Sequence, residues 1–359
     1  MSPEKPSHNI AQTTIHKAVR TLGILWLFAF SIRFLTAAEQ PLLALQLART
    51  INLPDVQGKF DHLAIDLAGS RLFVTSGGKH SVEVVDLKDD TVVQIIAGLG
   101  KPHGLAWVSA TSSLYVSDGA LAELRLYKGQ PLALAGTIKL SDDADDMAYD
   151  PTTRRLFVGH GGKDAANPAQ IAVIDTDRFA LVENLPASTH PEGIEIDLQS
   201  HRVFANIADS NEVTVIDQVK KSAPTIWKLT IATGNVPLAF DGQHQLIYVA
   251  CRKPGMLIAM DATTGKEVAS AQTSAGADDL FYDAALSRVY VITGAGEVDT
   301  YQVDAARKLR PLEILYTAAG AKTGLFVPSQ NLLYVGVPGT TIKASEIRVY
   351  STIKTERGQ

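Results

Sequence analysis

The side chains best suited to chemistry recur in two adjacent positions, at intervals of 42 to 47 residues along the chain. The first position holds Asp61, His103, Asp145, Glu192, Val236, Asp278 and Lys322. The second position holds His62, Gly104, Asp146, Gly193, Pro237, Asp279 and Thr323. Carboxylates and imidazoles that recur in this way can bind a divalent cation, orient a polar ligand or transfer protons if the fold brings them together.

The first position always lies twelve residues before the aromatic residue of a short aliphatic-aromatic-aliphatic segment. The seven aromatic residues are Phe73, Tyr115, Phe157, Phe204, Tyr248, Tyr290 and Tyr334. A repeat of this length, built of β-branched and aromatic runs separated by Gly, Asp and Ser, is typical of four-stranded blades. The sequence therefore predicts an all-β fold, a seven-bladed β-propeller of four-stranded antiparallel blades.

The repeat also predicts where each blade begins. Blades are expected to start near residues 60, 101, 145, 190, 235, 278 and 321, so that the propeller spans 60–352 and 353–359 form a tail. The seventh repeat ends soon after 347–350 without an outer strand of its own. Either 42–47 or 49–53, within the preceding segment 39–59, could supply that strand. Such a strand would close the ring and remove two free sheet edges.

The repeated segments carry a family resemblance. Leu72–Thr75 reads LFVT, Leu114–Ser117 reads LYVS and Leu333–Gly336 reads LYVG. With these segments, residues 60–350 resemble the YVTN-repeat family of seven-bladed propellers, and within it the exported, YncE-like branch of bacteria. The fourth repeat departs from the pattern, with Val203–Asn206 reading VFAN and an insertion at 220–224. The resemblance implies the propeller fold, export and a binding role, but it supplies no catalytic motif.

Residues 1–38 have the features of a secretory signal peptide. Lys17 and Arg20 precede the uncharged run 21–32, and small residues at 36–38 offer a cleavage site after Ala38. Arg33 interrupts the apolar segment, so an uncleaved amino-terminal anchor remains the alternative. In either case we expect an exported protein, periplasmic or extracellular.

Composition limits the classes of partner. The chain is 46% hydrophobic and 20% charged, which suits a packed globular domain, and Cys251 is its only cysteine, so it forms no internal disulfide. Its net charge is −5, and −8 once residues 1–38 are removed. An acidic domain without a Lys/Arg cluster argues against nucleic acid and against anionic membrane surfaces. We expect a monomer with no membrane contact beyond an amino-terminal anchor.

Both repeat positions enter the innermost strand of a blade, so we expect them to meet at one mouth of the central channel. The candidate metal ligands are Asp61, Asp145, Glu192 and Asp278. The candidate ligand-binding residues are His62, His103, Asp146, Asp279, His160, Arg252 and Lys322, with His160 and Arg252 placed on rim loops. Oxygen-rich rings with one or two histidines suit calcium, magnesium, manganese or zinc. A cationic ligand, compensation by Lys322, or a merely water-filled polar mouth are the alternatives.

The chain lacks a Gly-x-Ser-x-Gly elbow, a phosphate-binding glycine loop, a His-Glu-x-x-His helix and a CxxCH haem site. No catalytic residue is therefore assigned, and the sequence favours a non-enzymatic binding module for a small molecule or a protein. The alternative is a metal-dependent, lactonase-like hydrolase. It resembles propeller lactonases in which Glu, Asn and Asp hold the metal, a chemistry that Glu192, Asp145, Asp278 and Asn206 could supply. A purely structural surface protein is the third hypothesis.

Overall fold

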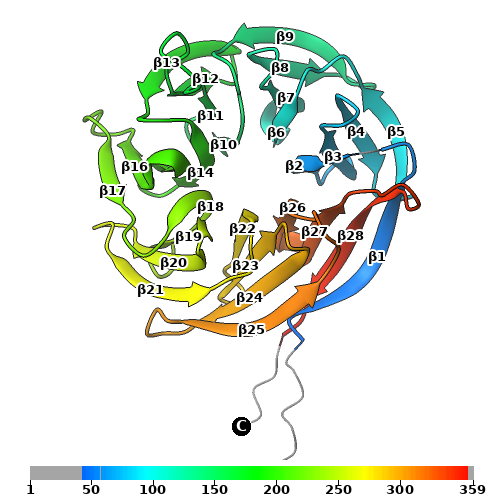
Figure 1. The fold of residues 1–359 in the computed structure, drawn as a ribbon. Coiled ribbons are helices and arrows are strands. Elements are labelled where there is room, and N and C mark those ends of the chain that lie inside the picture. The colour runs from blue at the N-terminus through cyan, green and yellow to red at the C-terminus, as the bar shows by residue number, and fades with distance from the viewer. Residues whose placement is uncertain (1–42, 57, 355–359) are drawn as a thin grey trace, which may run out of the picture. The chain divides into compact units, whose positions relative to one another are not determined.

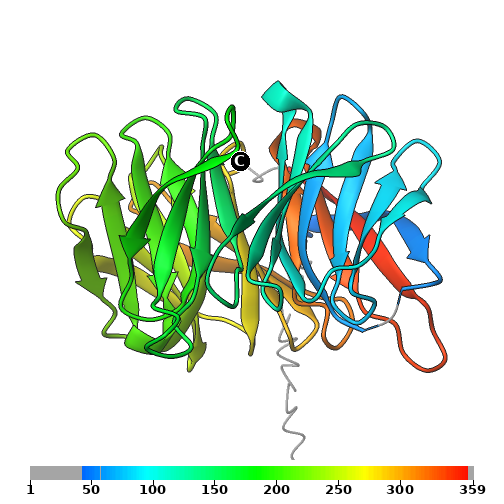
Figure 2. The same ribbon diagram turned by 90° about the horizontal axis from the view of Figure 1, so that it is seen from above.

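The computed structural model describes residues 43–56 and 58–354. These residues form seven four-stranded antiparallel sheets arranged as the blades of a propeller around a central channel (Figure 1). Seen edge-on, the strands run between the two broad faces of the propeller (Figure 2). The predicted signal segment lies outside the described residues. No helix within them is long and apolar enough to cross a bilayer.

The first four blades follow one another without interruption. Blade 1 contains β2 (Phe60–Asp66), β3 (Arg71–Ser76), β4 (Ser81–Asp86) and β5 (Thr91–Ile96). Blade 2 contains β6 (Pro102–Val108), β7 (Ser113–Asp118), β8 (Glu123–Lys128) and β9 (Ala133–Lys139). Blade 3 contains β10 (Met147–Asp150), β11 (Arg155–His160), β12 (Gln170–Asp175) and β13 (Ala180–Pro186). Blade 4 contains β14 (Pro191–Asp197), β15 (Arg202–Ile207), β16 (Glu212–Asp217) and β17 (Thr225–Lys228).

The last three blades complete the ring. Blade 5 contains β18 (Thr233–Asp241), β19 (Leu246–Lys253), β20 (Gly255–Asp261) and β21 (Glu267–Gln272). Blade 6 contains β22 (Ala277–Asp283), β23 (Arg288–Thr293), β24 (Glu297–Val303) and β25 (Leu309–Tyr316). Blade 7 contains β26 (Gly324–Val327), β27 (Leu332–Val337), β28 (Ser345–Thr352) and β1 (Leu45–Leu53). Short 3₁₀ turns are η1 (Ser109–Thr111), η2 (Ala208–Ser210) and η3 (Pro328–Gln330).

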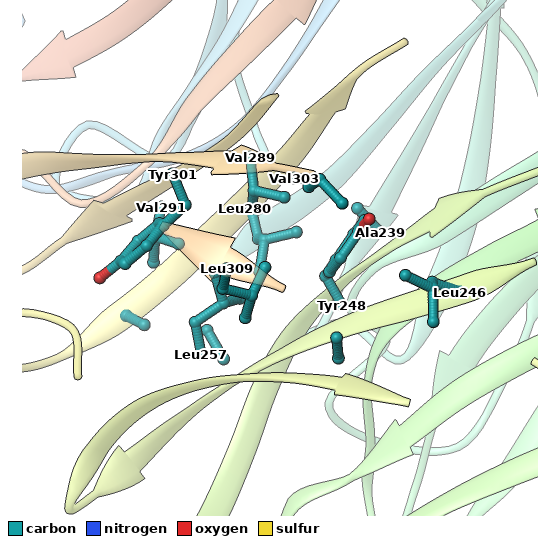
Figure 3. Packing of buried hydrophobic residues seen from close by; sticks show 13 residues of the cluster. Ala239, Leu246, Tyr248, Leu257, Leu280, Val289, Val291, Tyr301, Val303 and Leu309 are labelled. Carbon is teal, nitrogen blue, oxygen red and sulfur yellow. The ribbon is translucent and has the colours of Figure 1, made fainter. Parts of the chain in front are cut away.

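The core lies between neighbouring blades. The second strand of a blade is buried along nearly its whole length, because sheets cover both of its faces. In contrast, the outer strands β5 and β21 alternate between more and less exposed residues, with the period of two expected of a half-covered strand. Figure 3 shows one such interface, where Tyr248 and Leu257 of blade 5 pack with Leu280 and Val291 of blade 6.

The amino-terminal strand forms the outer strand of the last blade. β1 pairs with β28 antiparallel, from Leu45 opposite Thr352 to Leu53 opposite Ser345 (blue beside red in Figure 1). Ile51 is fully buried in the cluster that joins blade 7 to blade 1. The two ends of the propeller chain are thus held together by a sheet and by a shared core.

Candidate functional site

Five of the seven inner strands carry a β-bulge near their first residue. The register shifts lie between Phe60 and Leu63, Pro102 and Leu105, Pro191 and Ile194, Asn235 and Leu238, and Ala277 and Asp279. The two chemically rich positions of the repeat fall at these bulges. A bulge bends the strand and disturbs the strict alternation of side chains. Consecutive residues such as Asp61 and His62 can therefore both line the channel.

The inner strands enclose a cavity of about 400 Å³, which we call the mouth cavity. Ten of the eleven candidate residues line it: Asp61, His62, His103, Asp145, Asp146, Glu192, Arg252, Asp278, Asp279 and Lys322. They come from six of the seven inner strands or the residues just before them, and from the end of β19. The structure thus brings together the set that the repeat positions single out.

The structure does not bring His160 to the mouth cavity. This histidine ends β11 and is buried. Its Nδ1 accepts a hydrogen bond from the Ser141 N–H at 3.1 Å, and its Nε2 lies 3.2 Å from Asn184 Oδ1. Burial lowers the pKa of His160, and the ring links β13 of blade 3 to the segment that connects blades 2 and 3.

Asn206 is also unavailable for ligand binding. It is fully buried, and its side-chain amide donates to the carbonyl oxygens of Val236 and Pro237 at 3.1 and 3.0 Å. Its Oδ1 accepts a hydrogen bond from Asn235. The carboxamide therefore links blade 4 to blade 5, and the hydrolase hypothesis loses one of its four metal-binding groups.

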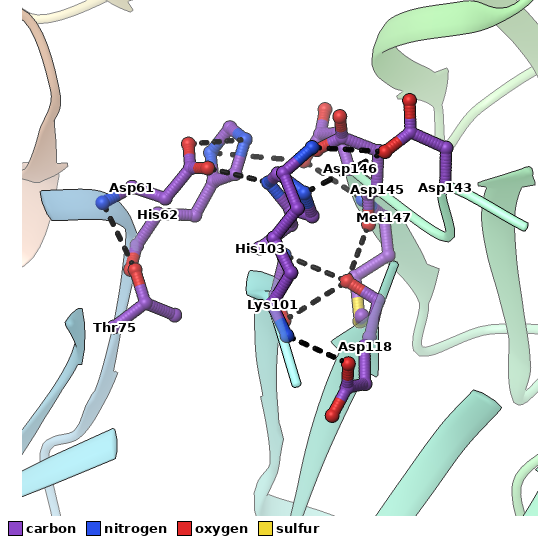
Figure 4. A network of polar contacts seen from close by, with 12 residues as sticks. Asp61, His62, Thr75, Lys101, His103, Asp118, Asp143, Asp145, Asp146 and Met147 are labelled. Carbon is purple, nitrogen blue, oxygen red and sulfur yellow. Dashed lines mark hydrogen bonds and ion pairs between the residues drawn. The ribbon is translucent and has the colours of Figure 1, made fainter. Parts of the chain in front are cut away.

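Asp61, His103 and Asp145 come from three consecutive blades and place one ligand atom each within 4.8 Å of one another (Figure 4). His103 Nδ1 lies 2.5 Å from Asp61 Oδ2 and 3.6 Å from Asp145 Oδ1. Ligand atoms of a tetrahedral zinc site are separated by about 3.4 Å, given metal–ligand distances of about 2.1 Å. A cation bound here would need Asp61 and His103 to move apart by less than 1 Å, roughly a side-chain adjustment.

His190 places a second imidazole beside this cluster, next to Asp145. Its Nδ1 donates to the Gly161 carbonyl at 2.7 Å, which leaves Nε2 directed at Asp145 Oδ2, 3.6 Å away. Within the described residues, the buried His190 Nε2 has no hydrogen-bond partner; the buried His103 Nε2 has none either, but it lies 3.8 Å from Asp143, and it is Nδ1 of His103 that contacts Asp61 and Asp145. A backbone carbonyl that holds one ring nitrogen and frees the other is the usual arrangement of a metal-binding histidine.

Without a bound cation, the histidines at this cluster bind protons. Burial alone would lower the pKa of His190, but its contact with Asp145 outweighs this effect and raises the pKa to about 9. Burial also disfavours the charged form of His103, but the hydrogen bond to Asp61 and the charges of Asp145 and Asp61 together outweigh it and raise the pKa of His103. A metal ion would have to displace these protons, so its binding should release them.

Another part of the mouth cavity holds two cationic side chains, Arg252 and Lys322. Asp278 accepts hydrogen bonds from both Arg252 and Lys322. Arg252 also donates through Nε to the Ala277 carbonyl at 2.9 Å. Asp278 is thus engaged by two cations, away from the group formed by Asp61, His103 and Asp145. Glu192 lines the same cavity, and burial followed by repulsion from Asp145 raises its pKa.

His62 provides a built-in positive charge at the channel. Its imidazole lies 3.7 Å from Asp279 Oδ1, 3.8 Å from Asp61 Oδ1 and 3.9 Å from Asp146 Oδ1. Burial disfavours the charged ring, but the carboxylates, Asp146 and Asp279 first, outweigh it and raise the pKa of His62 to about 10. His62 is therefore protonated at neutral pH.

Asp146 and Asp279 have structural contacts as well. Asp146 Oδ2 accepts the Ile194 N–H at 2.9 Å, and Asp279 Oδ2 accepts the Gly324 N–H at 2.6 Å. Each carboxylate thus joins its own blade to the next. Burial raises the pKa of Asp279 to about 7, so this carboxyl group gains or loses a proton near neutral pH.

Two hydroxyl groups and one acid at the site were not anticipated from the sequence. Thr75 Oγ1 accepts the Asp61 N–H and donates to the His62 carbonyl, and Ser117 Oγ does the same between the Gly104 N–H and the Asp145 carbonyl. Both residues stand two places after the repeat aromatic, which is the signal that could have identified them. Deeper in the cavity, burial raises the pKa of Glu195 to about 8.

Ser117 should be the more sensitive of the two positioning hydroxyls. Its side chain is fully buried, so Ser117→Ala leaves the Gly104 N–H and the Asp145 carbonyl without their shared partner. We expect a loss of about 2 kcal/mol in the free energy of unfolding, measured by urea denaturation. Ser113→Ala is the matched control, since this buried serine of the same strand bonds only the nearby Thr111 carbonyl. Equal losses in the two variants would argue against a positioning role for Ser117.

Comparisons with known proteins identify the fold. No protein family matches the chain, and no curated protein matches it. Among solved structures, "Structure of U3-55K" aligns with a TM-score of 0.71 at 12% identity, covering 87% of this chain and 100% of that one. "Crystal structure of RRP9 WD40 repeats" aligns with a TM-score of 0.71 at 11% identity, covering 86% and 98%. A chain of "Crystal Structure of Mitotic Checkpoint Complex" aligns with a TM-score of 0.72 at 12% identity, covering 94% and 99%. At such identities the likeness shows the WD40-like propeller fold alone.

Proposed function

We propose that this chain is an exported, YncE-like binding module whose mouth cavity holds a divalent metal ion. The ligands would be Asp61, His103 and Asp145, with His190 as a fourth. The observation that carries the proposal is the convergence of Asp61, His103 and Asp145, beside which the buried Nε2 of His190 faces Asp145 without a hydrogen-bond partner among the described residues. The proposal of export rests on residues 1–38 of the sequence.

The donor set favours zinc or manganese over calcium or magnesium. Calcium prefers six to eight oxygen ligands, and magnesium keeps several waters. Two imidazole nitrogens with two carboxylate oxygens suit a borderline metal in a four-coordinate site. Glu192, Asp278 and the remaining carboxylates would then shape the electrostatic surroundings of the ion.

Elemental analysis of the exported protein, purified without chelator or metal-affinity resin, tests this proposal. We expect near one equivalent of zinc or manganese, and a release of protons when apoprotein is titrated with the metal. Asp145→Asn should weaken metal binding by about 100-fold or more, because it removes a charged ligand shared by both imidazoles. Asp177→Asn, an equal charge change on an exposed aspartate, should leave the metal content unchanged.

Metal-free wild-type protein that also fails to take up zinc or manganese on dialysis would overturn the proposal. The hydrolase alternative rests on one feature, a group of few possible metal ligands beside a cavity, where a bound ion would have room for a substrate. A lactone turnover assay on the metal-loaded protein decides between binding and hydrolysis. Turnover that disappears in Asp145→Asn would favour the hydrolase.

A further inference from the structure

The mouth cavity has two chemically different walls. Blades 1 to 3 contribute the acidic and imidazole cluster around Asp61, His103 and Asp145. The other wall carries Arg252 at the end of β19 and Lys322 just before β26, and both line the same cavity. Both cations contact the carboxylate of Asp278, and Glu192 and Asp279 line the same cavity.

Both cations have N–H groups that lack an acceptor among the described residues. Arg252 uses Nε on the Ala277 carbonyl and Nη2 on Asp278, and the described residues offer no acceptor to Nη1. The Lys322 ammonium carries three N–H donors and bonds only to Asp278 within the described part of the chain. Their side chains are 37% and 29% exposed, so a molecule in the cavity can reach them. An arginine beside a lysine is suited to a carboxylate, because charge-assisted hydrogen bonds of this kind are strong.

The cavity does not favour a cationic or aromatic ligand. The His62 imidazole already occupies the space among Asp61, Asp146 and Asp279, within 4 Å of each. Phe281 is the sole aromatic side chain among the described residues that line the cavity, so there is no stacking surface. A volume of about 400 Å³ lies near the lower end of small-molecule sites.

We infer that the mouth cavity binds a small dicarboxylate, with one carboxylate on the metal and the other on Arg252 and Lys322. This inference rests on the proposed metal site. A metal held by three or four protein groups can accept a further ligand at its open side. The two attachment points select a molecule with an anionic group at each end, whereas a monocarboxylate satisfies only one.

Isothermal titration of the full chain with malate and with lactate tests the inference. Both probes are 2-hydroxy acids, and they differ by the second carboxylate. Metal content is measured first on the same samples. In metal-loaded wild type we expect malate to bind at least tenfold more tightly than lactate. Lys322→Gln should abolish this preference and leave the metal content unchanged, since Arg252 still neutralises Asp278. Lys253→Gln is the matched control, because Lys253 is an exposed neighbour that does not line the cavity.

The outcomes separate the two proposals. Equal affinities for malate and lactate in the metal-loaded protein, or a preference that survives Lys322→Gln, overturn the dicarboxylate site and leave the metal site intact. Protein that takes up no metal refutes the metal site. In that case malate binding that depends on Lys322 would still support the cationic half of the inference, and no malate binding would overturn it.

Discussion

Ile51→Asp should unfold the propeller or cost at least about 4 kcal/mol of unfolding free energy, because it places an unpaired charge in a packed core. Ile51 is fully buried opposite Ile347, where β1 completes blade 7 and packs against blade 1. Loss of this strand would also expose the edge of β28 for pairing with other chains, so aggregation should accompany the loss of stability.

Gln46→Asp is the matched control for ring closure. It introduces the same carboxylate on the same strand at an exposed position, opposite the uncharged Ser351. Urea denaturation and light scattering of both variants measure the effect, and we expect Gln46→Asp to stay within about 0.5 kcal/mol of wild type. If the two variants proved equally stable, β1 would not be holding the ring closed.

His62→Gln should have the second largest effect. It removes the cation that lies within 4 Å of Asp61, Asp146 and Asp279, so Asp146 and Asp279 lose a positive neighbour, while Asp61 keeps its contact with His103. We expect a loss of about 3 kcal/mol at pH 7 in the presence of chelator. His201→Gln is a matched control, because His201 is similarly exposed but contacts only the Asp150 carboxylate. It should cost much less.

The stability difference between wild type and His62→Gln should depend on pH in a defined direction. The pKa of His62 is raised to about 10 in the folded protein, above its ordinary value of 6.5. A raised pKa contributes stability that is fully present below pH 6.5 and is lost as the pH rises through about 10. The gap between wild type and His62→Gln should therefore be wide near pH 7 and close toward pH 10. A gap that stays constant over this range would show that His62 acts through packing and not through charge.

The sequence alone determines the architecture, because seven tandem repeats of one hydrophobic strand pattern bury their apolar faces by stacking as blades around a central axis. Equivalent repeat positions occupy equivalent places in their blades, so nine candidate residues at these positions were predicted to meet at one channel mouth, and all nine line one cavity. Of the two candidates predicted on rim loops, Arg252 lines the same cavity and His160 does not. Whether they bind a metal or a ligand stays a prediction. The repeat also identifies the missing outer strand of blade 7, for which β1 is the partner in the structure.

The tertiary structure decides which members of the ring interact. Repeat spacing sets the position of a residue around the channel. Bulge geometry and the position of the next blade decide which side chains contact one another. Asp145 thus lies between His103 and His190, while its repeat equivalent Asp278 is engaged by Arg252 and Lys322. His160 and Asn206 are buried by neighbours that are distant in the chain, so neither side chain lines the cavity. The pattern of residue types therefore predicts the place of the site, and only packing between blades assigns its chemistry.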